Sequence, residues 1–321
     1  MKNIVKLCLV LSLCLWGCSS SNKHILDALH VDNGYLFNES DEIVQLKGVS
    51  THSLCRSERL INEEAFKEIH DWNVNVIRLS MYVEAQDGYT KSEYYREKNM
   101  ELINNGVEYA TKNDMYVIID WHVLQDQDPK KYIEQSKEFF NTISTTYKDY
   151  TNVIYEICNE PNHVSWESIK EYANTIIPII RNNNQDAIII VGTPTWSQDI
   201  DIAMQDPLSY DNILYAFHFY AASHKEDMQD KLIQCAKQHF PIFVSEYGIT
   251  ADTGSYPRDI DSANAWMDIL DTYSISSCMW SYSKANEASA IFSSSSLKTS
   301  NFSEDDLTET GIWFKNMLKK E

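Results

Sequence analysis

Two glutamates stand at the ends of apolar segments and could work as a pair. Glu160 closes residues 153–159 and is followed by Pro161, which cannot donate to a β ladder and therefore ends a strand. Glu246 closes residues 242–246, and Gly248 beyond it lets the chain turn. Two carboxyl groups brought together in this way suit paired catalysis, in which one group donates a proton and the other stays ionised.

Other polar and aromatic residues also stand at the ends of apolar segments. They are His52, Arg78, Trp121, His122, Asn159, Trp196, His218, Tyr220 and Trp280. Each residue alone has a structural explanation; Arg78, for example, could be a buried cation paired with an acid. Unrelated structural causes would not select the same end of so many segments, so the joint pattern indicates one binding cleft.

The chemistry that this set of residues suits is glycoside hydrolysis. One glutamic acid would protonate the leaving oxygen, and the second glutamate would attack the anomeric carbon. Arg78 and Tyr220 beside Glu246 would keep that carboxylate ionised, and less cationic surroundings would keep the proton on Glu160. Tryptophan rings would stack on the apolar faces of sugar rings.

The segments that must position these residues alternate between strands and helices. The expected strands are residues 44–50, 75–81, 115–121, 153–159, 187–191, 213–219, 242–246 and 276–280. The expected helices are residues 62–72, 100–113, 129–147, 166–183, 199–204, 225–239, 259–273 and 307–318. Eight strands buried on both faces predict an α/β protein with a single (β/α)8 barrel, whose strands end on one common face.

A doubly wound open sheet would show the same alternation of strands and helices. The count of eight strands and the lack of a glycine-rich phosphate loop favour the barrel. A short hairpin is expected before it, formed by residues 29–38 and 42–47 around Asn38-Glu39-Ser40-Asp41.

Several of these segment ends form recognisable motifs. The motifs are Ile118–His122, Val153–Asn162, His218–Ala221 and Val244–Gly248, extended by Thr193–Asp199 and Trp280–Ser283. In this order they resemble glycoside hydrolase family 5, most closely its bacterial cellulases, over residues 29–318.

The resemblance implies a retaining endo-β-1,4-glucanase that needs no cofactor and no metal. In such an enzyme Glu160 would be the acid/base and Glu246 the nucleophile. Asn159 would bind the 2-hydroxyl of the attacked sugar, and Arg78 and Tyr220 would flank the nucleophile. The substrate would be a β-glucan polysaccharide.

The resemblance also implies further substrate-binding residues along the cleft. They are His122 and His218 at the cleaved sugar, Trp280 beneath it, Trp196 on the leaving-group side, His52 at the next sugar on the other side, and Glu287 beyond the last strand.

Two departures from the family pattern affect distal sugar binding. Close relatives follow the first-strand histidine with an aromatic residue, whereas this chain has Ser53-Leu54-Cys55-Arg56. One sugar platform is therefore expected to be lost. After the last strand, relatives read Ser-Asp-Lys-Asn-Glu, but here Lys284 stands one place early and Ala285 follows it.

The N-terminus is predicted to be a targeting segment. Lys2 and Lys6 precede the apolar residues 7–16, and Gly17-Cys18 is followed by a polar stretch. Residues 1–18 are interpreted as a lipoprotein signal peptide with Cys18 as the lipidated residue, although Trp16 stands where a small residue is usual. Residues 19–28 would be a tether and residues 29–321 the catalytic domain.

This interpretation predicts a secreted protein of the bacterial cell surface or periplasm, attached to the membrane through a lipid on Cys18. The alternative is an ordinary secretory signal cut nearby. A spanning helix is disfavoured because the apolar run is shorter than the ~20 residues needed.

Composition narrows the possible partners. A formal charge of −20 argues against nucleic acid and anionic lipid as partners, and we expect a monomer. The four cysteines after the signal are far apart and are expected to be buried thiols: Cys55, Cys158, Cys235 and Cys278. A metal hydrolase is disfavoured because the histidines at the segment ends lack carboxylate partners in ligand spacing.

Two other functions remain as alternatives. A retaining β-glycanase of the same fold that cleaves mannan, mixed-linkage glucan or xyloglucan would share the catalytic residues. A glycan-binding lipoprotein that has lost catalysis would lack one of the two glutamates, and both are present.

Overall fold

The strands close into a barrel. The computed structural model describes residues 26–319. Its eight parallel strands are β3 (Lys47–Thr51), β4 (Val76–Tyr82), β5 (Tyr116–His122), β6 (Val153–Glu156), β7 (Ile189–Val191), β8 (Ile213–Tyr220), β9 (Ile242–Gly248) and β10 (Ser277–Tyr282). β10 pairs with β3 and closes the barrel. The predicted (β/α)8 fold is confirmed, and each strand overlaps its expected segment.

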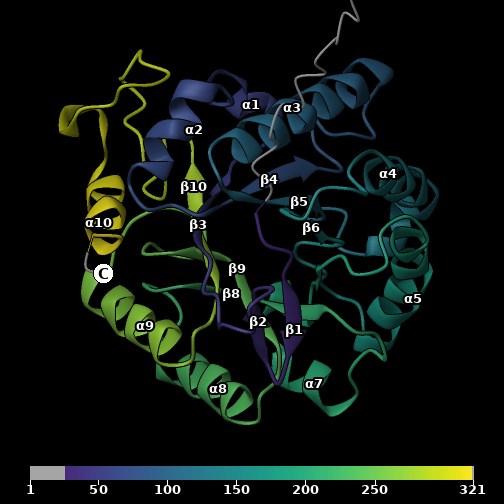
Figure 1. Cartoon of the computed structure of the whole chain (residues 1–321). Coiled ribbons are helices and arrows are strands. Elements are labelled where there is room, and N and C mark those ends of the chain that lie inside the picture. The colour runs from purple at the N-terminus through teal and green to yellow at the C-terminus, as the bar shows by residue number, and fades with distance from the viewer. Residues whose placement is uncertain (1–25, 320–321) are drawn as a thin grey trace, which may run out of the picture.

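Helices form a ring around the barrel (Figure 1). The eight expected helices are α2 (Glu63–His70), α3 (Glu93–Lys112), α4 (Ile133–Thr146), α5 (Trp166–Asn183), α7 (Ile200–Gln205), α8 (Glu226–Lys237), α9 (Ile260–Thr272) and α10 (Glu309–Met317). The first residues of the helix expected over 129–147 form a separate short helix, η2 (Pro129–Tyr132). Additional short helices are α1 (Leu54–Ser57), α6 (Pro194–Ser197), η1 (Glu58–Leu60) and η3 (Glu304–Asp306). Within residues 26–319 no helix combines the length and apolar character needed to cross a membrane.

Side chains alternate between the two faces of each strand. Val76 on β4 and Ile118 on β5 belong to an apolar cluster inside the barrel, whereas Ile77 belongs to the larger cluster between strands and helices. Because strand side chains repeat every two residues, Arg78 and Asp120 share the inner face with Val76 and Ile118. The barrel interior therefore changes from apolar near the strand N-termini to polar toward their C-termini.

The alternation is interrupted next to the functional residues. The pairing of β8 with β9 shifts between Ala216 and His218, and the pairing of β10 with β3 shifts between Trp280 and Tyr282. Such bulges re-aim side chains.

The N-terminal hairpin exists, but its predicted turn is wrong. β1 (His30–Asp32) pairs with β2 (Tyr35–Phe37) around Asn33-Gly34, not around residues 38–41. Asn33 and Gly34 have φ values of 48° and 86°, as a two-residue hairpin turn requires. The chain reverses a second time at residues 38–41. The segment after this turn pairs with β2 through a single antiparallel bridge, between Ile43 and Phe37.

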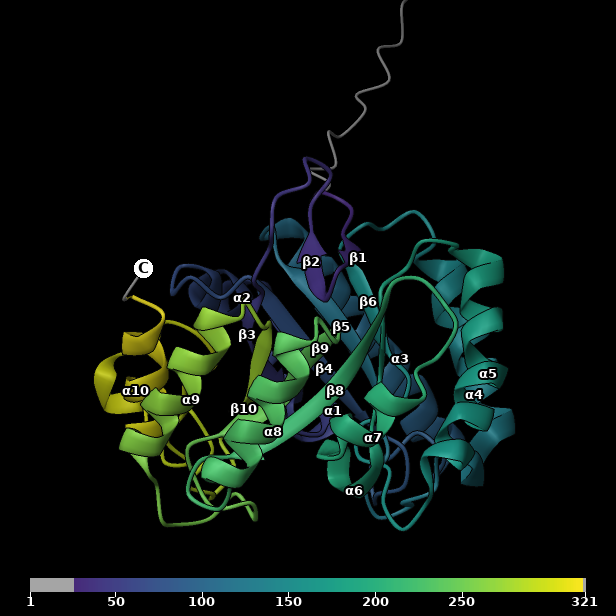
Figure 2. The ribbon, with the colours of Figure 1, turned by 90° about the horizontal axis from the view of Figure 1, so that it is seen from below.

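The hairpin lies at the N-terminal end of the barrel. Leu36 packs into the inner apolar cluster together with Leu46. Figure 2 shows the hairpin at one end of the barrel and α1 and α6, which follow the C-terminal ends of β3 and β7, toward the other end. The chain therefore enters the barrel on the side opposite the catalytic strand ends.

The four cysteines of the described part differ in burial. Cys158, Cys235 and Cys278 are buried, as expected, whereas Cys55 is only half-buried. Cys55 lies on the short helix α1, which the sequence interpretation did not include.

Candidate active site

Glu160 and Glu246 meet at the C-terminal end of the barrel. Glu160 follows β6, and Glu246 lies in β9, with exposed fractions of 9% and 5%. One carboxylate oxygen of each residue and one ring nitrogen of His218 all lie within 4.8 Å of one another. The barrel thus brings together the two carboxyl groups that the sequence places 86 residues apart.

Two side chains donate hydrogen bonds to the carboxyl group of Glu246. The Tyr220 hydroxyl donates to Glu246 Oε1 at 2.6 Å, and Arg78 Nη1 donates to Oε2 at 3.3 Å. A hydrogen bond to each oxygen fixes the orientation of this carboxyl group. The two residues expected to flank Glu246 are therefore both in contact with it.

The surroundings of Glu160 favour its protonated form. Burial raises the pKa of Glu160 to about 8, against the opposing charge of Arg78 and with support from Asp120 and Glu156. His218 Nδ1 lies 2.9 Å from Glu160 Oε1. Burial lowers the pKa of His218 to about 4, so the imidazole is neutral at pH 7 and does not supply a compensating cation.

Arg78 contacts Glu246 and is fully buried. Its Nε donates to Glu156 Oε2 at 2.6 Å, and its Nη2 lies 2.9 Å from Asp120 Oδ2 and donates to Asn159 Oδ1 at 2.6 Å. Burial opposes its charge, but the surrounding carboxylates hold the pKa of Arg78 well above its usual range. Arg78 is therefore both a buried cation paired with acids and a neighbour of Glu246.

The sequence interpretation gave no role to Asp120 and Glu156. Burial raises the pKa of Asp120 to about 7 and also raises that of Glu156. Two signals could have revealed them. Asp120 stands two residues before His122 and so shares its face of the strand, and Glu156 is an acid inside an apolar strand, as a partner for buried Arg78 would be.

His122 connects Asp120 to Asn159. Its Nδ1 lies 2.6 Å from Asp120 Oδ2, and its Nε2 lies 3.3 Å from Asn159 Nδ2. Burial and the charge of Arg78 hold the pKa of His122 well below its usual range. A neutral ring that donates from Nδ1 to Asp120 can accept from the Asn159 amide at Nε2, which orients that amide.

Aromatic rings line the site beside His122. Tyr82, which the sequence interpretation missed, stacks on His122 at 4.3 Å between ring centres. Trp280 lies 5.6 Å from His122 and 5.1 Å from His52, also between ring centres. The predicted floor residue Trp280 therefore lies against the predicted sugar-binding histidines.

Trp121 lies outside this site, although its sequence position grouped it with the strand-end residues. It is fully buried and packs against Tyr89 and Phe139. Because His122 points into the barrel, the preceding residue points outward to the helices.

Trp196 is exposed on α6, with 44% of its surface accessible. Thr195, Trp196 and Ser197 all have positive φ values, between 55° and 58°. Three consecutive residues in this region are costly without glycine, so the surroundings must hold them in place. Trp196 N donates to Pro161 O at 3.2 Å, and Ser197 Oγ donates to Asn159 O at 2.6 Å, which ties the loop to the Glu160 segment.

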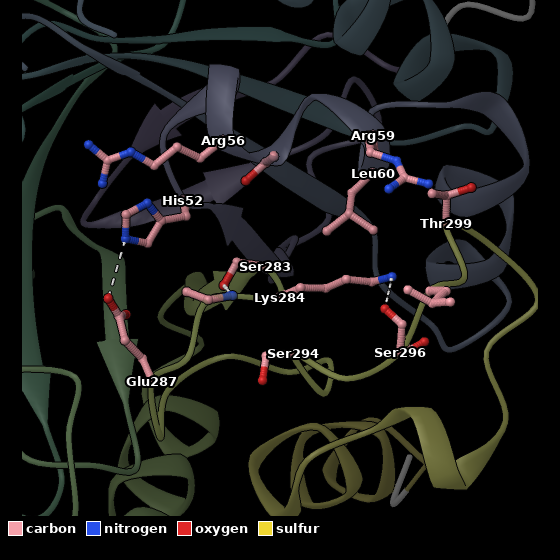
Figure 3. A pocket seen from close by; sticks show the side chains of 13 residues that line it. His52, Arg56, Arg59, Leu60, Ser283, Lys284, Glu287, Ser294, Ser296 and Thr299 are labelled. Atoms are coloured by element: carbon pink, nitrogen blue, oxygen red, sulfur yellow. Dashed lines mark hydrogen bonds and ion pairs between the residues drawn. The ribbon is translucent and has the colours of Figure 1, made fainter. Parts of the chain in front are cut away.

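The two departures from the family pattern line one pocket of about 400 Å³ (Figure 3). His52 stands at one end of the pocket, with its Nε2 3.8 Å from Glu287 Oε1. Arg56 pairs with Asp87 at 3.2 Å, and Lys284 Nζ donates to the Ser296 carbonyl at 2.9 Å.

Among the described residues, no aromatic ring other than His52 lines this pocket. The contact with His52 lowers the pKa of Glu287. Hydrogen-bonding and charged groups therefore stand where the family pattern would place a stacking platform.

One argument against a metal site was wrong. Glu160, His218 and Glu246 are close enough together to hold a cation, so His218 does have carboxylate partners. Both nitrogens of His218 are already in hydrogen-bonding contact, Nδ1 with Glu160 and Nε2 with Ser245 at 2.9 Å. These contacts explain the cluster without a metal.

Comparison with known protein families gives a decisive match. The model of the cellulase family (glycosyl hydrolase family 5) matches residues 37–286. The chain belongs to glycosyl hydrolase family 5. The matched range contains every predicted site residue except Glu287, which lies one position beyond it, and Cys18.

Relatives within family 5 are similar over most of this chain. Endoglucanase A of Butyrivibrio fibrisolvens is 41% identical over 91% of this chain and 68% of its own length. The endoglucanase of Clostridium saccharobutylicum is 39% identical over 90% of this chain and 64% of its own length. The chain thus spans about two thirds of the length of these curated relatives.

Solved structures of family 5 share the fold. Cellulase Cel5C_n superposes with a TM-score of 0.87 and 36% identity, covering 94% of this chain and 95% of that one. The catalytic domain of Thermobifida fusca endoglucanase Cel5A superposes with a TM-score of 0.86 and 34% identity, covering 91% of this chain and 97% of that one.

Proposed function

We propose that this family 5 protein is a retaining endo-β-1,4-glucanase that hydrolyses cellulose or a related β-glucan. The observation that carries the proposal is the short separation of Glu160 and Glu246, whose carboxylate oxygens approach within 4.8 Å. Retaining enzymes place their two carboxyl groups ~5–5.5 Å apart, whereas inverting enzymes need ~6.5–9.5 Å to admit a water between carboxylate and sugar.

The different surroundings of the two glutamates support a division of labour. Glu160, kept neutral by burial, would protonate the leaving glycosidic oxygen. Glu246, held as an anion by Tyr220 and Arg78, would attack the anomeric carbon and form a covalent glycosyl-enzyme. In the second step Glu160 would take a proton from water, whose oxygen then displaces Glu246 from the sugar.

Sugar binding is assigned to residues around this pair. Asn159, His122, His218 and Trp280 surround the position of the cleaved sugar, with Trp196 on the leaving-group side and His52 and Glu287 on the other. The neighbouring structures support a β-glucan as ligand, because a variant of Thermobifida fusca endoglucanase Cel5A has been solved in complex with cellotetraose. That complex superposes with a TM-score of 0.83 and 34% identity.

A panel of polysaccharides tests the proposal. Purified protein is incubated with soluble cellulose, mixed-linkage glucan, mannan and xyloglucan, and new reducing ends are measured. The fastest release should come from cellulose, and NMR should show the first product with the β configuration of the substrate. Faster cleavage of mannan or xyloglucan would support the rival β-glycanase, and binding without new reducing ends would support a non-catalytic glycan-binding protein.

We also propose that the protein is secreted and attached by a lipid on Cys18 to a bacterial membrane, at the cell surface or in the periplasm. The signal peptide at residues 1–18, Cys18 and most of the predicted tether at residues 19–28 lie outside the described residues. The position of the hairpin supports the proposal, because Figure 2 shows it at the barrel end away from α1 and α6. Glu160 and Glu246 belong to the opposite end, since they lie at or beyond the C-terminal ends of β9 and β6. An anchored molecule would then present its cleft away from the membrane, as a monomer that binds glycan and no nucleic acid.

A further inference from the structure

A continuous chain of hydrogen-bonding contacts runs from Glu160 into the barrel. His218 Nδ1 lies 2.9 Å from Glu160 Oε1, and His218 Nε2 lies 2.9 Å from Ser245 Oγ. Ser245 Oγ lies 2.7 Å from Glu156 Oε1, and the other oxygen of Glu156 accepts from Arg78 Nε at 2.6 Å. Ser245 and Glu156 are fully buried, so water does not complete these contacts.

The direction of the hydrogen bonds follows from Arg78, which can only donate. Its contact with Glu156 is shorter than its contacts with Asp120 at 2.9 Å and Glu246 at 3.3 Å. Burial and the charge of Asp120 raise the pKa of Glu156, whereas the charge of Arg78 and this short hydrogen bond lower it. Of the three acids around Arg78, Glu156 is therefore the one that Arg78 holds most strongly as an anion. An ionised Glu156 accepts at both oxygens, so Ser245 donates its only hydrogen to Glu156 Oε1.

The state of His218 follows from that of Ser245. Because the hydrogen of Ser245 points at Glu156, the Ser245 oxygen must accept from His218, which places the hydrogen of the neutral imidazole on Nε2. Nδ1 then carries a lone pair and can only accept. Of the two forms of Glu160, only the protonated one has a hydrogen to donate to Nδ1.

We propose that Ser245 and Glu156 are positioning residues for catalysis, which fix His218 with its hydrogen on Nε2 so that Nδ1 holds the proton-bearing oxygen of Glu160. The proposal deepens the proposed function and rests on Glu160 being the acid/base. It assigns the serine before Glu246 and the acid within β6 to one task, the control of where the Glu160 proton stays.

The same arrangement would help both steps of the reaction. In the first step the proton leaves Glu160 for the glycosidic oxygen as the bond from that oxygen to the anomeric carbon breaks. The resulting carboxylate faces the lone pair of His218 Nδ1 without a hydrogen between them. This unfavourable contact would be relieved when Glu160 takes a proton from the attacking water in the second step.

Other charged groups face this chain from the neighbouring strands. Arg78 on β4 favours loss of the proton from Glu160, whereas Asp120 on β5 and Glu156 on β6 favour its retention. Glu246 on β9 favours and Arg78 opposes a positive charge on His218. A test must therefore reverse the hydrogen-bond direction while leaving Arg78, Asp120 and Glu246 in place.

Glu156→Gln should reverse the direction of the chain. Arg78 Nε requires an acceptor, so the amide oxygen faces Arg78 and the amide nitrogen faces Ser245. The amide then donates to Ser245, Ser245 donates to His218 Nε2, and His218 Nδ1–H donates to Glu160. A donor at this position stabilises the Glu160 anion and lowers its pKa. Loss of the Glu156 charge lowers that pKa as well, so the hydrogen-bond direction itself is reported by 15N NMR and by a variant that keeps this charge.

Two measurements should report this reversal. 15N NMR of imidazole-labelled protein should place the His218 hydrogen on Nε2 in the wild type and on Nδ1 in Glu156→Gln. The basic limb of the pH profile of kcat/KM on cello-oligosaccharides should move down by about one pH unit or more, a tenfold change in proton affinity. A dinitrophenyl cellobioside, whose leaving group needs no proton, should show no such shift.

Ser245→Ala is the second variant, and Ser50→Ala is the matched control. Ser245→Ala removes the acceptor that holds the His218 hydrogen on Nε2, so the basic limb should shift in the same direction even if Glu156→Gln does not fold. Ser50 is also a buried serine and accepts from Arg78 Nη1 at 3.1 Å, but it does not touch His218. Ser50→Ala should leave the basic limb where it is in the wild type.

Two results would overturn the proposal. One is a wild-type His218 with its hydrogen on Nδ1; the other is an unshifted basic limb in Ser245→Ala, which keeps the charge of Glu156. The NMR measurement needs no turnover. A protein that hydrolyses no glucan but keeps the His218 hydrogen on Nε2 would therefore refute the proposed function separately from the assignment of the His218 tautomer.

Discussion

Glu160→Gln should make the protein more stable than the wild type at alkaline pH. In the folded protein, burial raises the pKa of Glu160 from 4.5 to about 8, whereas in the unfolded chain the carboxyl group returns to its ordinary value. The folded state therefore binds this proton more tightly, and the wild type loses stability as pH rises from the unfolded pKa through the folded one.

The size of this loss follows from the shift in pKa. A rise from 4.5 to about 8 corresponds to about 5 kcal/mol of unfolding free energy, fully present below the unfolded pKa and fully lost above the folded one. Glutamine has nearly the shape of protonated glutamic acid, and its amide can donate to His218 Nδ1. It cannot ionise, so the variant should not undergo this loss.

Urea unfolding of both proteins from about pH 4 to about pH 9 measures the effect. The stability of Glu160→Gln relative to the wild type should rise with pH and level off above about pH 8. Glu287→Gln is a control for which the change in unfolding free energy should have the opposite sign. Contact with His52 lowers the pKa of Glu287, so its charge stabilises the fold at neutral pH and the variant should be less stable there. If the unfolding free energies of the wild type and Glu160→Gln change in parallel across the whole pH range, Glu160 is not held neutral by burial.

Three further predictions concern the nucleophile, the exposed indole and the anchor. Glu246→Ala should abolish turnover, with azide restoring it as a glycosyl azide of inverted configuration, whereas Glu160→Ala should still be glycosylated by a dinitrophenyl glycoside; variants with these behaviours exchanged would reverse the assignment. Trp196→Ala should slow polymer hydrolysis by an amount that corresponds to ~1–3 kcal/mol, by analogy with the stacking of nucleic-acid bases on aromatic rings. Because the Trp196 side chain is 44% exposed, the melting temperature of the variant protein should stay close to that of the wild type. A large drop in melting temperature would show that Trp196 belongs to the core instead. Cys18→Ala should move the protein from the membrane fraction to the soluble fraction, and a wild type that is already soluble would contradict lipidation.

The sequence by itself determined the architecture and the position of the catalytic pair. Apolar segments of strand length alternate with segments of helical spacing, and both patterns are local, so the eight barrel strands could be located to within a few residues. Pro161 and Gly248 indicate strand ends for equally local reasons; β6 ends five residues before Pro161, and β9 ends at Gly248. In a parallel barrel these ends must share one face, which is why the two glutamates could be paired without a structure.

Local patterns were less successful where two interpretations compete within a few residues. Both residues 33–34 and residues 38–41 carry turn-forming residues, and the hairpin forms around Asn33-Gly34. Trp121 and His122 are adjacent at a strand end, but only His122 reaches the site. Which of two neighbours faces the barrel depends on how the strand is set in the sheet, and this information is not contained in the strand alone.

Only the tertiary structure decided the partners and the protonation of the buried residues. Arg78, Glu156 and Glu246 lie on three different strands, and their contacts exist because the barrel closes with one particular register, which pairs Ser50 with Arg78 and Asp120 with Glu156. The raised pKa of Glu160 has the same origin, because desolvation depends on how completely all the surrounding elements exclude water. A residue's type is encoded locally, but its burial and its charge partners are properties of the closed barrel.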